Sequence, residues 1–143
     1  ILAEHELAAI AGLDRIEVCG PDVVLVAEAV QPMALFLHEM ATNAVKHGSL
    51  SRPGGRVALA WRTDGVSGRL HLRWSECHGP SVMRPDRAGF GTALMREVVE
   101  SQLDGTLQID WRSNGIVSTL VLPSGHLTAA TMAPAPAGHR QAY

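Results

Sequence analysis

The chain has 143 residues, of which 46% are hydrophobic and 18% charged, with a formal net charge of -2. This length and composition predict one folded domain with its own core and exclude an intrinsically disordered chain. The weak net charge gives no electrostatic footprint for nucleic acid or an anionic membrane, so we expect neither partner. With two cysteines, no signal peptide and no apolar stretch long enough to span a bilayer, the sequence predicts a cytoplasmic location.

The first third of the sequence predicts helices on either side of short strands. Residues 1–13 are weakly helical, and 15–25 predict two short strands around a turn at 20–22. A long helix should follow, with Pro32 near its first turn and Gly48 as its stop. Apolar residues at helical spacing form its core stripe: Met33, Leu37, Met40, Ala41 and Ala44.

After this helix the apolar period changes to two, which predicts two hairpins. Alternation over 57–61 and 70–74 is separated by Asp-Gly and Ser-Gly pairs that suit a hairpin loop. A second pair of strands, 107–111 and 116–122, should be joined by the turn Asn114-Gly115. Between the hairpins, a loop is followed by a predicted helix over 90–103, whose core-facing candidates are Ala93, Leu94, Val98 and Leu103.

These elements predict an α/β fold: a two-layer sandwich of one mixed, mostly antiparallel sheet with helices on one face. Residues 15–123 should form this domain, and Pro123 should end the sheet. Residues 124–143 are rich in Ala, Pro, Gly and Thr without periodicity, so we expect them to be a disordered tail.

Three polar residues of the long helix share one face, away from the core stripe. Glu39, Asn43 and Lys46 stand at i, i+4 and i+7. An amide oxygen can ligate Mg²⁺, a carboxylate can orient a water, and an ammonium can meet phosphate oxygens. The spacing alone is more typical of an ordinary solvated helix face.

Two further segments could meet a ligand. Gly89-Phe90-Gly91 opens the second helix, where free backbone N–H groups attract phosphate, although such a pair of glycines is often only a turn. Glu76 ends a strand, where it could accept a hydrogen bond from a ligand amine or simply be an exposed acid. Trp74 alternates in register with Leu70 and Leu72, which predicts a core position.

Two metal sites can be set aside on the sequence. His38-Glu39 lacks the second histidine of a zinc-protease helix, because position 42 is Thr42. Cys77-His78 has no partners at metal-ligand spacing.

Taken together, three segments resemble the HWE group of histidine kinases. The stretch His38–Ser51, which reads HEMATNAVKHGSLS, resembles the N box of that group, and Trp74-Ser75-Glu76 resembles its Trp-x-Glu motif. Gly89-Phe90-Gly91 resembles its second glycine box, and the likeness runs from about residue 15 to 123. The resemblance implies the GHKL ATPase fold, shared with gyrase and MutL, with ATP held between the N-box helix and a lid at 81–88.

The same resemblance implies a role for each matching residue. Asn43 would ligate Mg²⁺, Glu39 would be the polar catalytic carboxylate, and Lys46 would contact phosphate and assist catalysis. Glu76 would take the place of the adenine-binding aspartate of other GHKL proteins. His38 is diagnostic of the group but receives no firm chemical role. The implied ATP-binding set is Asn43, Lys46, His47, Glu76, Gly79, Arg87, Gly89, Phe90 and Gly91.

The sequence departs from the group in two places. The first glycine box usually reads Glu-x-Gly-Gly-Pro, and here His78 stands at its first glycine. The pattern around a phospho-accepting histidine is absent, so residues 1–14 are interpreted as a linker from a missing dimerisation and phosphoacceptor segment. The expected partners are that phosphoacceptor domain, through which a homodimer could form, and a response regulator. Two alternatives stay open: an anti-sigma-factor serine kinase of the same fold, and a non-catalytic nucleotide-binding module.

Overall fold

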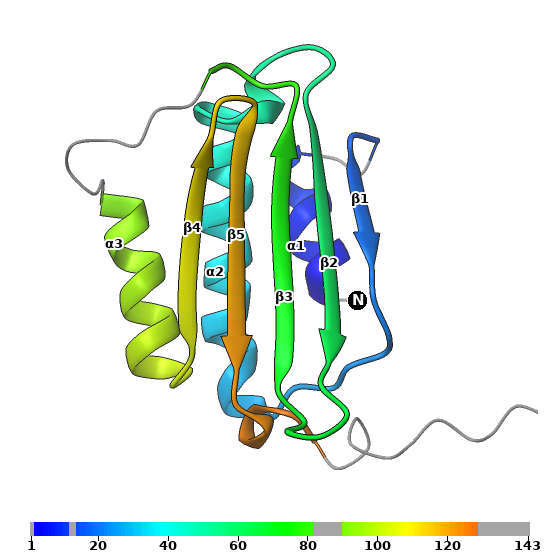
Figure 1. Cartoon of the computed structure of the whole chain (residues 1–143), viewed down its shortest axis with the longest axis vertical. Coiled ribbons are helices and arrows are strands. Elements are labelled where there is room, and N and C mark those ends of the chain that lie inside the picture. Colours follow the sequence, from blue (N-terminus) through cyan, green and yellow to red (C-terminus); the bar gives the residue numbers. More distant parts are fainter. Residues whose placement is uncertain (1, 12–13, 82–89, 129–143) are drawn as a thin grey trace, which may run out of the picture.

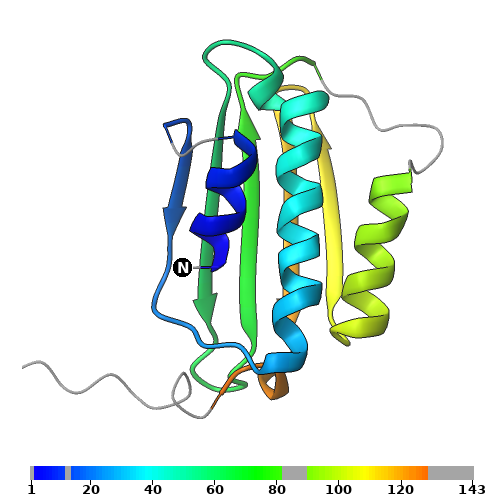
Figure 2. The same ribbon diagram turned by 180° about the vertical axis from the view of Figure 1, so that it is seen from behind.

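A five-stranded sheet covered by helices on one face makes up the described part of the chain, which comprises residues 2–11, 14–81 and 90–128 of this computed structural model (Figures 1 and 2). The strands are β1 (Ile16–Cys19), β2 (Arg56–Thr63), β3 (Leu70–Cys77), β4 (Thr106–Arg112) and β5 (Gly115–Leu122). Their order is β1-β2-β3-β5-β4, with β1 parallel to β2 and every other pair antiparallel. The predicted sandwich with a mixed, mostly antiparallel sheet is therefore confirmed.

The helical layer consists of three helices behind the sheet (Figure 2). They are α1 (Leu2–Ala11), α2 (Ala27–Lys46) and α3 (Phe90–Glu97), the last continued by the π-helix η2 (Val98–Gln102). Two short 3₁₀ turns complete the set: η1 (Ser49–Ser51) directly after α2, and η3 (Ser124–His126) after β5.

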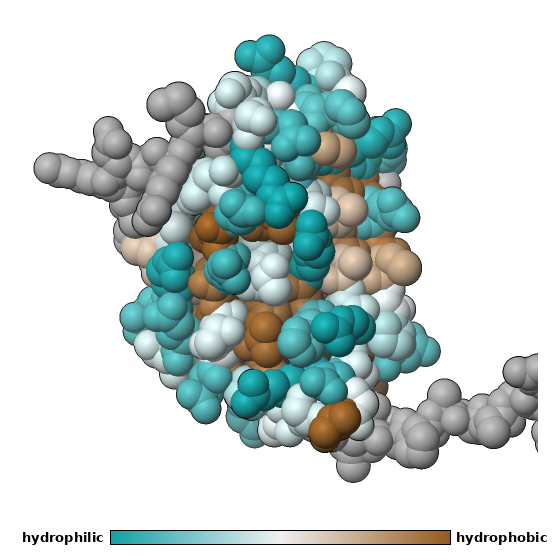
Figure 3. All heavy atoms as spheres, viewed as in Figure 1, coloured by the Kyte–Doolittle hydropathy of each residue, from teal (hydrophilic) through white to brown (hydrophobic). Residues whose placement is uncertain are grey.

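The alternation of apolar residues in the strands separates the two faces of the sheet. On β3, Leu70, Leu72 and Trp74 are buried against the helices, and Trp74 is fully inaccessible, as its register predicted. The opposite face carries exposed polar side chains such as Arg62, Arg73 and Gln108. In Figure 3 hydrophilic residues are interspersed with hydrophobic ones on this face. The hydrophobic core therefore lies entirely between the sheet and the helices.

Helix α2 is the centre of that core. All five residues of its predicted stripe are buried, together with Ala29, Pro32 and Phe36. Its end also follows the prediction, because the N–H groups of His47 and Gly48 both donate to the carbonyl oxygen of Asn43 at 2.9 Å. Its start does not: α2 begins at Ala27, so Pro32 lies in the second turn, where it removes one helical hydrogen bond.

The second helix also differs from its prediction. Val98 and Leu103 are buried and Leu94 packs against the core, but Ala93 is exposed. Ala93 is five residues before Val98, which is about 140° around a regular α-helix, so the two cannot face the same side. At η2 the N–H of Leu103 bonds to the carbonyl of Val98, five residues earlier, and this wider turn lets Val98 and Leu103 both face the core. Met95 and Val99 are buried in addition.

Three boundaries from the sequence need correction. Only one strand, β1, forms in 15–25, and Leu25 makes just an isolated bridge to Leu127. The second hairpin turns at Ser113-Asn114, and Gly115 is already the first residue of β5. The folded unit is wider than 15–123, because α1 packs on α2 with Leu7 fully buried, and Leu127 is buried beyond Pro123. Residues 129–143, the remainder of the predicted tail, lie outside the described residues.

Candidate functional site

The N-terminus of α3 meets the polar face of α2. Glu39 and Asn43 lie one turn apart on α2, and both are half-buried. A Cβ atom added to Gly91 would stand 3.0 Å from Oε2 of Glu39 and 3.6 Å from Nδ2 of Asn43. We call these three residues the Glu39–Asn43–Gly91 cluster. It joins two motifs that are 48 residues apart in sequence, and it leaves the α3 backbone open beside a carboxylate and an amide.

The chemistry of this cluster fits a Mg²⁺–phosphate ligand. Mg²⁺ takes oxygen ligands and commonly keeps several waters, with one or two protein oxygens and phosphate oxygens completing its octahedron. Asn43 offers such an oxygen, and Glu39 can orient a water. Among the residues that the structure describes, no group of three or more His, Cys, Asp or Glu could form an all-protein metal cage. The donor set is therefore suited to a metal that arrives with a phosphate ligand.

Glu76 has a different environment from the one its strand-end position indicated. It is only 4% exposed, so the interpretation as an exposed acid is wrong. Its Oε2 accepts a hydrogen bond from the backbone N–H of Ser49 at 2.7 Å, and its Oε1 accepts one from Nε1 of Trp74 at 3.1 Å. We call these three residues the Glu76 cluster. It connects the end of β3 to the turn that follows α2.

Glycines allow the backbone to close around the Glu76 cluster. A Cβ at Gly48 would collide with Oε2 of Glu76 and come within 2.8 Å of Cα of Ala44. A Cβ at Gly79 would stand 2.5 Å from Cα of Ser49, and one at Gly115 would collide with the carbonyl of Glu76. A side chain at any of these positions would force backbone atoms apart, which explains why glycine stands there.

The structure describes only some of the remaining predicted site residues. Lys46 and His47 are exposed at the end of α2, and Gly79 packs against Ser49. Arg87 and Gly89 lie outside the described residues, and only the backbone of Phe90 is described. His38 is exposed on α2, so its side chain does not pack in the core.

His78, the departure in the first glycine box, has a left-handed backbone with φ of 58°. This conformation strains any side chain with a Cβ and is the usual reason for glycine. The structure thus retains the backbone shape that a glycine would give, and the imidazole projects as an exposed side chain rather than packing in the core.

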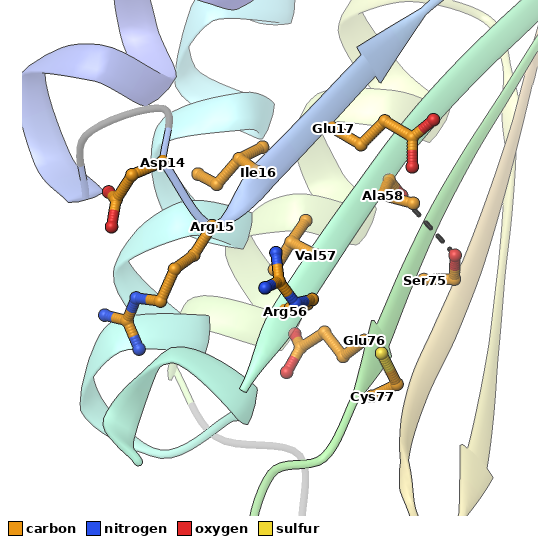
Figure 4. Close-up of a pocket in the computed structure, with 10 residues that line it drawn as sticks. All are labelled: Asp14, Arg15, Ile16, Glu17, Arg56, Val57, Ala58, Ser75, Glu76 and Cys77. Atoms are coloured by element: carbon orange, nitrogen blue, oxygen red, sulfur yellow. Dashed lines mark hydrogen bonds between the residues drawn. The ribbon is translucent and has the colours of Figure 1, made fainter. Parts of the chain in front are cut away.

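A pocket of about 290 Å³ lies at the β1 side of the Glu76 cluster (Figure 4). Arg15, Arg56 and Glu76 contribute to its lining, whereas Glu39 and Asn43 do not. In Figure 4 the Arg15 guanidinium points away from the pocket, toward η1, where it donates to the carbonyl oxygens of Arg52 at 2.9 Å and Leu50 at 3.3 Å. The pocket is therefore separate from the Glu39–Asn43–Gly91 cluster. Of its two arginines, Arg15 already hydrogen-bonds to backbone carbonyls at and beside η1.

Two residues that sequence reasoning missed are Ser49 and Arg15. Both act on η1, Ser49 through its backbone and Arg15 through its side chain. A backbone donor leaves no mark in a side-chain pattern, and an arginine before a strand has no distinctive signal, so neither could be found without the fold.

Comparisons with known proteins find similarity to histidine kinases. No family model matches the sequence. A blue-light-activated histidine kinase of Rhizobium johnstonii is 38% identical over 111 residues, which are 78% of this chain and 32% of that protein. The chain therefore spans about a third of the length of this curated relative. In the described residues, no helix has the length and apolar character needed to cross a bilayer.

Solved structures agree on the fold. The blue-light activated histidine kinase EL346 of Erythrobacter litoralis superposes with a TM-score of 0.70 at 21% identity, covering 87% of this chain and 40% of that one. The catalytic domain of the histidine kinase ThkA gives a TM-score of 0.62 at 14% identity, covering 85% and 91% respectively. The fold is that of a histidine kinase catalytic domain, as the resemblance to the GHKL fold implied. In sequence the chain is similar to about a third of the Rhizobium histidine kinase, and in fold it is similar to histidine kinase catalytic domains.

Proposed function

We propose that the chain binds ATP with Mg²⁺ at the Glu39–Asn43–Gly91 cluster and transfers the γ-phosphoryl group to a histidine of a phosphoacceptor domain. The observation that carries this proposal is the contact of Gly91 with Glu39 and Asn43. It supports a phosphate-binding helix start facing a metal-binding amide, which is what phosphoryl transfer requires of a protein. The three motifs further support membership of the HWE group.

Each residue has a defined task in this proposal. Asn43 holds Mg²⁺ through its side-chain oxygen, and the metal would neutralise charge on the phosphate oxygens. Glu39 would accept a hydrogen bond from a water or from the N–H of the attacking imidazole. Lys46, exposed one turn from Asn43, pairs with phosphate oxygens. Catalysis in such a site comes from positioning and charge stabilisation, because the chain forms no covalent bond to the phosphoryl group.

The base would lie toward the end of α2. His47 is exposed there, and Gly79 packs beside η1, which supports the proposal that both border a bound adenosine. Arg87, Gly89 and Phe90 are proposed to close over the triphosphate from the lid side. The partners proposed for the whole kinase are its phosphoacceptor domain and a response regulator, with the domain acting in the cytoplasm where ATP is supplied.

The alternatives are distinguished by what accepts the phosphoryl group. The relatedness to histidine kinases does not favour the serine kinase. A non-catalytic nucleotide module would bind ATP without transferring phosphate, and His78 in the first glycine box is the residue that motivates it.

The decisive experiment combines binding with transfer. Asn43→Ala should lower the Mg²⁺-dependent affinity for ATP by roughly tenfold or more while the circular dichroism spectrum stays unchanged. Glu39→Gln should retain ATP binding but lower the rate of transfer to a supplied phosphoacceptor domain. The matched controls are Gln31→Ala and Glu28→Gln, which change exposed residues on the other end of the same helix. Unchanged binding in Asn43→Ala, or effects of equal size in the controls, would contradict the proposal.

A further inference from the structure

The face of the sheet that points away from the helices has no described element over it. In Figure 1 the strands β2, β3 and β5 lie in front of the helices, and Figure 2 shows the helices on the other side of the sheet. We propose that this open face is a docking surface for an acidic helix of a partner protein. The role goes beyond the proposed function, because it uses none of the residues of the Glu39–Asn43–Gly91 cluster.

The first argument is the composition of the outward row of β2. Leu59 is fully buried toward the helices, so the alternate positions of the strand point to the open face. These positions hold Arg56, Ala58, Ala60 and Arg62. Alanine is depleted in strands, so the two alanines are not explained by the sheet itself. They leave room for a helix to approach closely, with a positive charge at each end of the row.

The second argument is that the neighbouring strands continue this surface of short side chains. The register of β2 and β3 places Ser75 beside Ala58 and Arg73 beside Ala60. On the other side of β3, Thr119 of β5 lies next to Arg73. The centre of the open face therefore consists of short side chains around one guanidinium group, which gives a bound helix a third cationic contact.

The third argument is that the fold does not neutralise these charges. The arginines of β2 and β3 that point to the open face are Arg56, Arg62 and Arg73. Within the described part of the chain, their side chains form no ion pair and no hydrogen bond. Asp110 on the same face already pairs with Arg112 at 2.8 Å. Because the whole chain has a net charge of -2, the positive charge is local to this face, which suits a small acidic surface of a partner protein.

The spacing of the arginines sets the length of the partner helix. Arg56 and Arg62 are six positions apart, which is about 20 Å along a strand. A helix covers this distance in about 13 residues, or roughly three and a half turns. Carboxylates at both ends of such a helix can meet the two guanidinium groups, while small residues between them rest on Ala58 and Ala60.

The test uses a helical probe peptide of alanine and glutamate, in which two glutamates lie about 13 residues apart on one face. Titrated at low salt into the isotope-labelled chain, it should shift the amide signals of β2, β3 and β5 and leave those of α2 in place. Raising the salt concentration should weaken the binding, because exposed charges are screened. Two control peptides should bind several-fold more weakly: one with lysine in place of glutamate, and one with the glutamates about half as far apart.

Variants of the chain make the result specific. Arg56→Gln and Arg62→Gln should each weaken the binding of the glutamate peptide by about two- to fivefold, the range for one exposed ion pair. Ala60→Glu places a carboxylate in the middle of the surface and should weaken the binding by roughly tenfold or more. The matched control is Arg52→Gln, which changes an exposed arginine after η1, outside the sheet, and should leave the affinity unchanged. All four positions are exposed, and circular dichroism checks that each variant is folded.

Four other outcomes would overturn the inference. The first is no binding of the glutamate peptide, or equal binding of the lysine peptide. The second is an affinity that stays the same in both arginine variants. In the third, the same amide signals shift with the concentration of the chain alone, which would assign the face to a second copy. In the fourth, duplex DNA or vesicles of phosphatidylserine and phosphatidylcholine bind more tightly than the peptide, which would assign the face to an extended polyanion.

Discussion

Replacing Gly91 with alanine should keep or raise the stability of the fold while it lowers the affinity for ATP. Gly91 is the second residue of α3, and alanine is preferred over glycine within helices by up to about 1 kcal/mol. The added Cβ would stand 3.0 Å from Oε2 of Glu39, so this oxygen has to move by a few tenths of an ångström. Glu39 is half-buried and its side chain can rotate, so the cost is small. We expect the free energy of unfolding to stay constant or rise by up to about 1 kcal/mol.

The same methyl group fills the space beside Asn43, where the phosphate and its metal are proposed to bind. Its Cβ would lie 3.6 Å from Nδ2 and 3.7 Å from Oδ1 of Asn43. The affinity for ATP with Mg²⁺ should therefore fall by roughly tenfold or more, which corresponds to about 1.4 kcal/mol. Thermal unfolding and isothermal titration calorimetry of the same preparations measure both effects.

Gly65→Ala is the matched control, because a Cβ at Gly65 would meet no atom within 4 Å. It should leave nucleotide affinity unchanged. Wild-type affinity in Gly91→Ala would show that no ligand enters the Glu39–Asn43–Gly91 cluster. If Gly91→Ala lowers the free energy of unfolding by more than about 2 kcal/mol, the side chain of Glu39 cannot move aside for the added Cβ, which would contradict this prediction.

Three further outcomes are expected. Incubation of the chain with labelled ATP should give no acid-labile phosphoprotein, because His38 lies on α2 and His47 caps its end, so we expect neither imidazole to be in line with a bound γ-phosphate. Strong labelling of any histidine would contradict this prediction. His78→Gly should raise the free energy of unfolding by about 0.5–1 kcal/mol by relieving the left-handed φ of 58°, and a decrease in a denaturant titration would refute the strain. The N–H of Val66 donates to Asp64 at 2.8 Å, and this hydrogen bond lowers the pKa of the Asp64 carboxyl. The ionised carboxyl therefore stabilises the fold above the ordinary carboxyl pKa, and this contribution is lost as pH falls through the lowered pKa. Asp64→Asn should therefore flatten the acid side of the melting-temperature profile, and parallel profiles for the two proteins would argue against it.

Much of the fold follows from apolar periodicity alone. The stripe of α2 and the alternation in β2, β3 and β5 each depend on local spacing, so the sequence predicts the two layers and both hairpins. The errors arise where a longer-range interaction decides. Gly115 belongs to β5 because its backbone packs against the carbonyl of Glu76, and that contact moves the hairpin turn one residue back from Asn114-Gly115. Ala93 is an error of a different kind, because it lies about 140° around a regular α-helix from Val98, so helical spacing itself places it on another side.

The candidate site divides in the same way. Glu39 and Asn43 share a face by helical spacing, and the structure brings Gly91 to them, which spacing within one helix could not show. The inward direction of Glu76 was available from the sequence, because it continues the register of Leu70, Leu72 and Trp74. The charge of Glu76 favours exposure, whereas its register position favours burial, and the structure follows the register. Its partner on Ser49 is a backbone N–H, which no residue pattern reveals.

Pro32 has a consequence for how α2 opens. With no N–H at this position, the carbonyl of Glu28 lacks its helical partner, and the first turn is held mainly by the bond from Val26 to His126 and by the bridge of Leu25 to Leu127. Local unfolding of a helix proceeds from its weakest end. Amide hydrogens at the start of α2 should therefore exchange with solvent sooner than those around Asn43. The missing bond at Pro32 thus makes the end of α2 that is remote from Asn43 the part of the helix that opens most easily.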